Sequence, residues 1–222
     1  MKTTHISFTT KNGDSTAFVA IPDDGPSDKA IVLIHEWWGL NDHIKDIAGR
    51  YAEEGFTVIA PDLYRGVVLT TPEEASKAMH ALAIDDGIDT ISCAISASKQ
   101  TFDLKSFGIT GFCMGGTFAL RAACELEVFS AAAPFYGDIP EEDVLLRLTV
   151  PTVFISGIRD AWITPEKVDG LEGIATNHGL PVKCVRYDSD HAFFNDTRPE
   201  VYDEKSARDA WSLVIGFFRD NL

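Results

Sequence analysis

The chain has 222 residues, of which 45% are hydrophobic and 24% are charged, a composition typical of a soluble globular protein with one substantial core. It carries 19 Lys and Arg against 34 Asp and Glu, for a formal net charge of −15. Because such an acidic surface repels phosphate backbones, we expect no nucleic-acid partner. No apolar stretch is long enough to span a bilayer, and the N-terminal residues lack the apolar block of a signal peptide, so we expect no membrane partner and a cytoplasmic location.

The predicted elements alternate between strands and helices. An N-terminal hairpin over 5–9 and 16–21 turns at Asn12-Gly13, and continuous apolar runs thereafter indicate strands that are covered on both faces. Such alternation predicts one α/β domain over 1–222, with a mostly parallel sheet of about eight strands and helices on both faces. The further strands are predicted at 30–35, 56–61, 106–110, 129–137, 151–157 and 181–188, and the helices at 42–55, 72–82, 85–100, 115–125, 165–179 and 203–222.

One of the four cysteines stands out from the others. Cys93, Cys124 and Cys184 lie in apolar helix or strand patterns, where we expect them to be buried as small hydrophobic residues. Cys113 instead lies in "GFCMGG", directly after the strand predicted at 106–110. Glycines on either side of a reactive side chain are typical of a sharp strand–turn–helix connection that exposes a nucleophile.

Two other polar residues also follow predicted strands. Asp160 comes after the strand at 151–157, and His191 comes after the strand at 181–188. The carboxyl ends of parallel strands meet at one edge of a sheet, and the chain order nucleophile, acid, histidine is that of the α/β-hydrolase triad. The sequence therefore predicts a triad of Cys113, His191 and Asp160. The carboxylates that compete with Asp160 for the third position are Asp138, Asp188 and Asp190.

A thiol at the start of a helix has a favourable environment for nucleophilic chemistry. Unpaired N–H groups and the partial positive charge of the helix start stabilise a thiolate and the oxyanion formed on attack. The product of that attack is a thioester. A different class of function remains open, in which Cys113 is the oxidisable thiol of a redox sensor or the chain is a catalytically silent interaction protein.

Neither a metal nor a nucleotide cofactor is expected. "HEWWG" begins like the zinc motif H-E-x-x-H, but its fifth position is Gly39, and the other histidines have no paired ligand spacing. "GFCMGG" has the glycine spacing of a phosphate-binding loop, but Thr117 stands where that loop requires lysine. We therefore expect a cofactor-free protein.

Four stretches together resemble the dienelactone hydrolase (carboxymethylenebutenolidase) family of α/β-hydrolases, from about Thr16 to the C-terminus. They are "HEWWGLNDHIKDIAGRYAEEGFTVIAPDLYRG", "GFCMGG", "SGIRDAWIT" and "DHAFFNDTRPEVYDEKSARDAW". The resemblance implies an α/β-hydrolase fold and cofactor-free hydrolysis of lactones or small esters. It implies that Cys113 is the nucleophile, that His191 is the general base and later acid, and that Asp160 is the orienting carboxylate.

The resemblance also implies roles for residues outside the triad. The backbone N–H groups of Trp37 and Met114 would form the oxyanion hole. Glu36 would hold the resting thiol and take its proton when substrate arrives, although a buried carboxylate that pins its loop is the alternative. Tyr64, in "PDLY", would line the substrate pocket.

The chain departs from the namesake enzyme of the family in its substrate arginines. That enzyme clamps the carboxylate of its lactone with one arginine four residues after the catalytic histidine, where this chain has Asn195. For the second arginine, in the segment after "PDLY", this chain offers only Arg65 and Lys77. Arg198, in "NDTRPE", is a further candidate, with a surface role as its alternative. Without a guanidinium pair, a small dianionic lactone would be recognised poorly. We expect a small-molecule ester or lactone as the partner, phosphotriesters or other esters as alternatives, and a monomer or small homo-oligomer.

Overall fold

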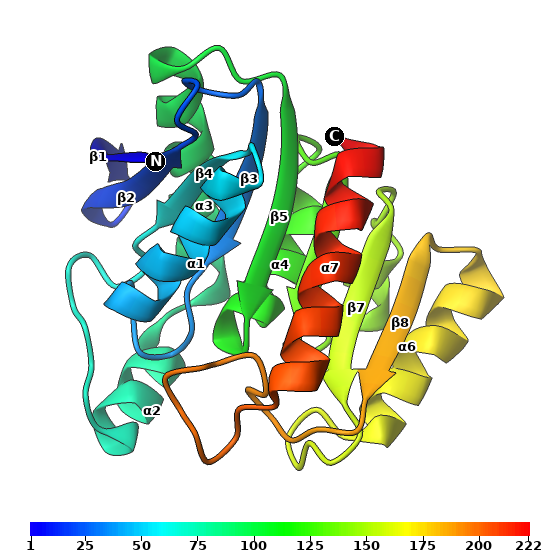
Figure 1. Ribbon diagram of the computed structural model, residues 1–222. Coiled ribbons are helices and arrows are strands. Elements are labelled where there is room, and N and C mark those ends of the chain that lie inside the picture. Colours follow the sequence, from blue (N-terminus) through cyan, green and yellow to red (C-terminus); the bar gives the residue numbers. More distant parts are fainter. The chain divides into compact units, whose positions relative to one another are not determined.

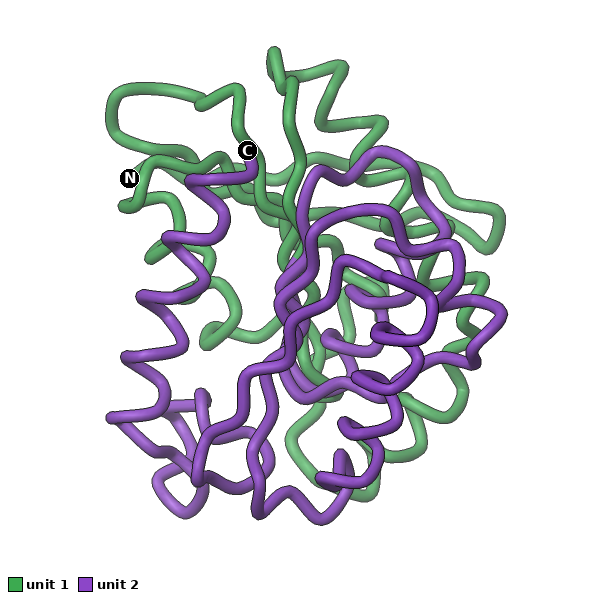
Figure 2. Tube along the Cα trace, turned by 90° about the vertical axis from the view of Figure 1, so that its right-hand side faces the viewer, with its two compact units in different colours: residues 1–109 green, residues 110–222 purple.

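The computed structural model describes residues 1–222 as an α/β protein with an eight-stranded, mixed and mostly parallel sheet (Figure 1). The strand order is β1-β2-β4-β3-β5-β6-β7-β8. The chain divides into two compact units, Met1–Ile109 and Thr110–Leu222, which Figure 2 distinguishes by colour. The boundary falls within β5 (Ser106–Phe112). The prediction of a single domain over 1–222 stays a prediction.

The first unit begins with an antiparallel hairpin. Its two strands are joined by a turn in which Gly13 adopts φ +124°, a conformation that favours glycine. The second strand pairs antiparallel with β4, and β4 pairs parallel with β3. In Figure 1, α1 and α3 lie on opposite faces of these strands. The elements are β1 (Lys2–Thr10), β2 (Gly13–Ile21), β3 (Lys29–Ile34), α1 (Asp42–Glu53), β4 (Thr57–Pro61), α2 (Pro72–Ala81) and α3 (Ile84–Thr101).

The second unit consists of parallel strands separated by helices. β6 pairs with β7, and β7 pairs with β8 over its whole length. In Figure 1, α7 lies on one face of these strands, and α4 lies on the other. The elements that follow β5 are α4 (Met114–Glu125), β6 (Ala131–Phe135), α5 (Glu142–Leu145), β7 (Thr152–Gly157), α6 (Pro165–His178), β8 (Val182–Tyr187) and α7 (Glu204–Asn221).

Local sequence signals explain where several helices begin and end. The side chains of Asn41, Thr71 and Thr164 each accept a hydrogen bond from a backbone N–H in the first turn of α1, α2 and α6. Pro72 and Pro165 occupy first helical positions, which need no N–H. Gly179, with φ +65°, ends α6 in the left-handed conformation.

The predicted α/β architecture is confirmed, with one element missed and one expectation partly wrong. The four-residue α5 was not predicted. Cys124 is buried as expected, but Cys93 and Cys184 are only half-buried. Cys184 is less buried because it lies on β8, the edge strand of the sheet, which has a neighbour on one side only. No helix combines the length and the apolar character that crossing a membrane requires.

Candidate active site

Cys113 forms the whole connection between β5, which ends at Phe112, and α4, which begins at Met114. Its backbone has φ 55° and ψ −119°, which is rare for a residue with a side chain and costs on the order of 1–3 kcal/mol. Two hydrogen bonds hold this conformation: the Cys113 N–H donates to the Phe135 carbonyl at 3.1 Å, and the Cys113 carbonyl accepts from the Thr117 N–H at 3.1 Å. The predicted strand–turn–helix connection is therefore present.

Two glycines allow the backbone to pack closely beside this turn. A Cβ atom on Gly116 would lie 2.2 Å from the Phe135 carbonyl oxygen and 2.9 Å from the Gly137 nitrogen. A Cβ atom on Gly137 would lie 2.1 Å from the Gly116 carbonyl carbon. The first turn of α4 thus rests directly on the backbone at the end of β6, with no room for a side chain between them. This contact fixes the start of α4 and the position of Cys113.

Asp160 and His191 are joined by a short hydrogen bond. The distance between Asp160 Oδ2 and His191 Nδ1 is 2.6 Å. The other carboxylate oxygen of Asp160 accepts from the N–H groups of Trp162 at 2.8 Å and Ile163 at 2.9 Å. Burial raises the pKa of Asp160, but the hydrogen bond to His191 and the two backbone donors outweigh it, so that the pKa lies below its ordinary value. Asp160 is therefore an ionised carboxylate, and both of its oxygens accept hydrogen bonds.

The hydrogen bond to Asp160 determines the tautomer of His191. With Asp160 ionised, Nδ1 carries the proton, and Nε2 is left as the acceptor. His191 Nε2 is buried and has no hydrogen-bond partner. The imidazole ring contacts Tyr136 at 5.1 Å and Trp162 at 5.2 Å between ring centroids. An imidazole that is oriented by a carboxylate and whose second nitrogen is available to accept a proton is suited to act as a general base.

The loops that carry Asp160 and His191 are also tied through their backbones. Arg159 N–H donates to the Ser189 carbonyl at 3.1 Å. A Cβ atom on Gly157 would lie 2.3 Å from that same carbonyl oxygen, so that only glycine lets the end of β7 approach the segment after β8. This approach brings the acid and the histidine within hydrogen-bond distance.

Ring contacts connect His191 with the residue that precedes Cys113 in the sequence. Phe112, next to Cys113, contacts Tyr136 at 6.2 Å between ring centroids, and Tyr136 contacts His191. The competing carboxylates are engaged elsewhere: Asp138 pairs with Lys167 at 2.9 Å, and the remaining two, Asp188 and Asp190, pair with Arg159. Asp160 is the carboxylate that bonds His191.

In the first unit, Glu36, Trp37 and Tyr64 lie on the loops after the neighbouring strands β3 and β4. Glu36 is buried, with 2% of its surface exposed, and its carbonyl accepts from the Gly39 N–H at 3.1 Å. Tyr64 contacts the His35 ring at 5.1 Å between centroids. The roles of Glu36 and Tyr64, and the oxyanion-hole roles of Trp37 and Met114, stay predictions.

His35, the first residue of "HEWWG", has a structural role that its sequence pattern did not predict. Its ring is fully buried, with Nδ1 2.6 Å from the Glu36 carbonyl oxygen and Nε2 accepting from the Leu63 N–H at 3.1 Å. Burial lowers the pKa of His35, against the opposing effects of the Glu36 hydrogen bond and the Asp62 charge. A neutral His35 therefore joins the loop that carries Glu36 to the loop that carries Tyr64.

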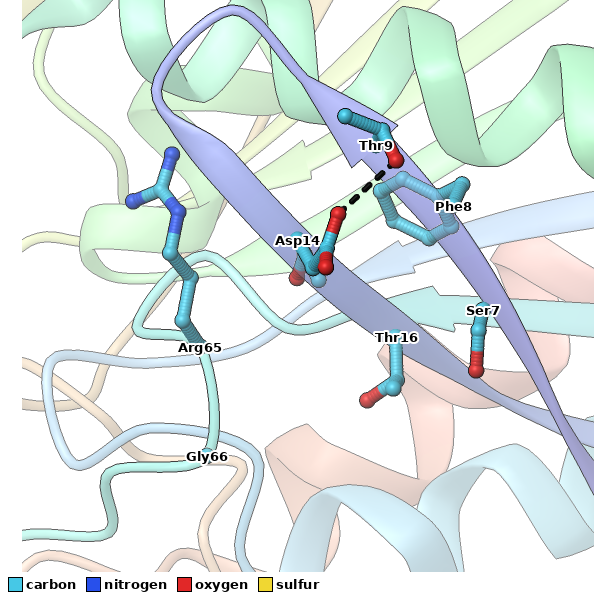
Figure 3. A pocket seen from close by; sticks show the side chains of 8 residues that line it. Ser7, Phe8, Thr9, Asp14, Thr16, Arg65 and Gly66 are labelled. Carbon is cyan, nitrogen blue, oxygen red and sulfur yellow. Dashed lines mark hydrogen bonds between the residues drawn. The ribbon is translucent and has the colours of Figure 1, made fainter.

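A pocket of about 440 Å³ lies beside the β1–β2 hairpin of the first unit (Figure 3). Thr9 donates to Asp14 across the hairpin at 2.8 Å, and the Arg65 guanidinium pairs with Asp86. None of the predicted site residues lines this pocket. Its lining consists of Ser7, Phe8, Thr9, Asp14, Ser15, Thr16, Arg65 and Gly66.

The mostly parallel sheet, with Cys113 in a strand–turn–helix connection and an Asp–His pair on loops after later strands, is the architecture of the α/β hydrolases. Residues 16–222 match the model of the dienelactone hydrolase family, and the chain belongs to that family. It is a dienelactone hydrolase-like hydrolase.

Relatives support this assignment over nearly the whole length. The chain is 34% identical over 227 residues to "Protein usf" of Aquifex pyrophilus, and 34% identical over 228 residues to a "Putative carboxymethylenebutenolidase" of Aquifex aeolicus. Each comparison covers 96% of both proteins. The crystal structure of a "Putative Dienelactone Hydrolase" of Klebsiella pneumoniae is 26% identical, with a TM-score of 0.89 and 98% of both chains covered. A dienelactone hydrolase-like promiscuous phosphotriesterase from metagenomic libraries shares the fold, with a TM-score of 0.89 at 18% identity and 99% and 98% of the two chains covered.

Proposed function

We propose that the protein hydrolyses lactones or small esters through a thioester formed on Cys113, with His191 as the proton carrier and Asp160 as the residue that orients it. The single observation that carries this proposal is the 2.6 Å hydrogen bond between Asp160 and His191, in the same unit as a cysteine held in a strained turn. A histidine oriented by a buried carboxylate, with its second nitrogen unpartnered, is suited to moving a proton between a nucleophile and a leaving group.

In the acylation half of the reaction, His191 Nε2 takes the proton of Cys113, and the sulfur attacks the carbonyl carbon. The resulting oxyanion lies at the start of α4, where the Met114 N–H and the helix charge stabilise it. The family resemblance assigns the second donor to the N–H of Trp37. When the tetrahedral intermediate collapses, the C–O bond breaks, and the leaving oxygen takes the proton from His191. The acyl group is then a thioester on Cys113.

In the deacylation half, His191 Nε2 takes a proton from water as the water oxygen attacks the thioester carbonyl. Collapse of the second intermediate breaks the C–S bond, releases the carboxylic acid and returns the proton to Cys113. With a lactone, the leaving alcohol stays attached to the acyl group, so ring closure competes with water. The balance between these two routes depends on how quickly water reaches the thioester.

The test is turnover of p-nitrophenyl acetate and simple lactones by wild type and by Cys113→Ala, with Cys124→Ala as the matched control. Burial raises the pKa of the Cys124 thiol to about 12, so its removal leaves the chemistry unchanged. We expect Cys113→Ala to lose turnover and Cys124→Ala to retain it; equal turnover by wild type and Cys113→Ala rejects the proposal. Including phosphotriesters in the panel tests the activity that the metagenomic neighbour is described as having.

The effect of replacing His191 distinguishes a thiol-based redox sensor from an enzyme. Both require a reactive Cys113 thiol, so iodoacetamide labelling across pH distinguishes them only in part. A sensor has no need of His191 for ester turnover. Loss of turnover in His191→Ala therefore favours the enzyme, and wild-type turnover in that variant contradicts it.

A further inference from the structure

Trp162 is the exposed aromatic residue beside the proposed catalytic base. Its ring lies 5.2 Å from the His191 ring, with 45° between the two planes, and 36% of its surface is exposed. Its backbone N–H donates to Asp160 Oδ1 at 2.8 Å, and the other oxygen of the same carboxylate bonds His191. One carboxylate thus holds both the base and the segment that carries the indole ring. The indole is a fixed apolar surface next to His191.

The loop that carries Trp162 and the loop that carries His191 together have an excess of negative charge. In 158–164 and 188–203 the cations are Arg159 and Arg198, against five aspartates and one glutamate. Arg159 pairs with Asp188 and Asp190, and Arg198 pairs with Glu200 at 2.8 Å. Both guanidinium groups therefore already face carboxylates, and a substrate carboxylate placed beside His191 would meet repulsion.

The position four residues after His191 offers no charge either. Asn195 is buried, with 2% of its surface exposed. Its Oδ1 accepts from the Thr197 N–H at 3.1 Å and from the Thr197 hydroxyl at 2.6 Å. This side chain organises its own turn. The surroundings of His191 are consequently acidic and aromatic.

We propose that Trp162 is a specificity residue that contacts the alcohol part of a neutral substrate, and that the enzyme prefers esters or lactones with a flat, uncharged, apolar group on the leaving oxygen. This inference rests on the proposed function. His191 delivers its proton to the leaving oxygen, so the group attached to that oxygen lies next to His191 during acylation. The ring that contacts His191 is therefore the one that meets this group, and burial of one aromatic surface against another stabilises the complex.

The test compares acetate esters that share one acyl group and differ in the alcohol: methyl, phenyl, 2-naphthyl and 4-carboxyphenyl acetate. The measured quantity is kcat/KM, which reports acylation. For Trp162→Ala we expect a decrease of about tenfold or more with 2-naphthyl acetate, mainly through KM, and a decrease of less than about threefold with methyl acetate. Trp162→Phe is expected to recover most of the difference. Wild type is expected to hydrolyse phenyl acetate faster than the 4-carboxyphenyl ester.

Ile158→Ala is the matched control, because Ile158 is an exposed apolar residue of the same loop, with 46% of its surface exposed. This variant is expected to keep the wild-type ratio between the naphthyl and methyl esters. A readout independent of hydrolysis is the binding of 2-naphthol to Cys113→Ala, measured by calorimetry, which an added Trp162→Ala change is expected to weaken about tenfold.

Two results would overturn the inference. One is an equal loss for all four esters in Trp162→Ala with unchanged 2-naphthol binding, because the ring would then act on His191 alone. The other is faster hydrolysis of the 4-carboxyphenyl ester than of phenyl acetate. Either result leaves the proposed function intact as long as turnover depends on Cys113, whereas turnover that survives Cys113→Ala rejects the proposed function itself.

Discussion

Asp160 Oδ2 lies 2.6 Å from His191 Nδ1, although the two residues are 31 positions apart in the chain. The parallel pairing of β7 with β8 brings their loops together, and the glycine at 157 lets the two backbones approach. Two backbone N–H groups hold the second carboxylate oxygen. Neither the carboxylate nor the imidazole ring can rotate without losing hydrogen bonds in a buried setting.

This geometry predicts a large kinetic effect of Asp160→Asn. The amide no longer stabilises a protonated imidazole or enforces the Nδ1–H tautomer, so kcat should fall by about 10²–10⁴-fold. The matched control is Asp138→Asn, whose carboxylate pairs with Lys167, and it should stay within about twofold of wild type because exposed ion pairs contribute little. Steady-state kinetics on one ester measures both. Near-wild-type turnover by Asp160→Asn would remove this residue from the mechanism.

The packing of α4 on β6 predicts an unequal response to two alanine substitutions. Gly116→Ala places a methyl group 2.2 Å from the Phe135 carbonyl oxygen, and because backbone atoms cannot move aside cheaply, the free energy of unfolding should fall by about 3 kcal/mol or more. Gly170→Ala, in α6 with no atom within 4 Å of the added Cβ, should instead gain up to about 1 kcal/mol from helix propensity. Urea denaturation measures both changes. A neutral effect of Gly116→Ala would mean that α4 and β6 are not in this close contact.

His35 predicts a pH dependence of stability that comes from the fold rather than from catalysis. Its folded-state pKa is lowered, chiefly by burial, so as the pH falls below about 6.5 the unfolded chain takes up a proton before the folded chain does. The free energy of unfolding should therefore decrease in that range, by at most about 1.4 kcal/mol per pH unit. Protonated Nε2 also cannot accept from the Leu63 N–H, so the loops that carry Glu36 and Tyr64 lose their link.

The matched variant for this effect is His35→Gln. Its amide can donate to the Glu36 carbonyl and accept from the Leu63 N–H without titrating. The slope of the free energy of unfolding against pH, between pH 7 and 5, should therefore flatten. His80→Gln, at an exposed helical position, should leave the slope unchanged. Thermal unfolding across pH measures all three proteins. An equal slope in wild type and His35→Gln would assign the pH dependence to other groups.

The predicted role of Glu36 can be separated from a purely structural one. If Glu36, in place of His191, takes the proton of the Cys113 thiol, Glu36→Gln should slow both ester turnover and iodoacetamide labelling of Cys113 by about tenfold or more, with little change in urea stability. If the carboxylate only pins its loop, stability should fall while turnover per folded molecule stays constant. Measuring the three quantities on the same preparation decides between the two roles.

Much of the fold could be predicted because its signals are local. Apolar runs mark strands buried on both faces, and caps such as Thr164 with Pro165 mark helix starts. What was missed lacks such a signal. The four residues of α5 are too few to show a helical period. The polar first residues of β1 are exposed and show no alternation between buried and exposed positions.

The candidate site was predictable in its positions but not in its supporting contacts. Cys113, Asp160 and His191 could be predicted as site residues because each follows a strand, and the ends of strands can be identified from apolar runs. The exclusion of Asp138, Asp188 and Asp190 needed their ion pairs with Lys167 and Arg159, which depend on side-chain reach in three dimensions. The function of Gly137 depends on its contact with Gly116, 21 positions earlier in the chain, and no pattern in the sequence signals such a contact.

The most direct test of the thioester mechanism is to locate the acyl group on the protein. His191→Ala removes the base needed for deacylation, whereas the fraction of Cys113 that is already thiolate can still attack p-nitrophenyl acetate, because p-nitrophenolate leaves without a proton. Exposure of this variant to p-nitrophenyl acetate, followed by acid quench, should therefore trap the intermediate for peptide mass spectrometry. The proposed thioester mechanism predicts one acetyl group, on the peptide that contains Cys113, removable by hydroxylamine and missing when Cys113→Ala is added. Acetylation at another residue, or wild-type hydrolysis that persists without Cys113, would contradict it.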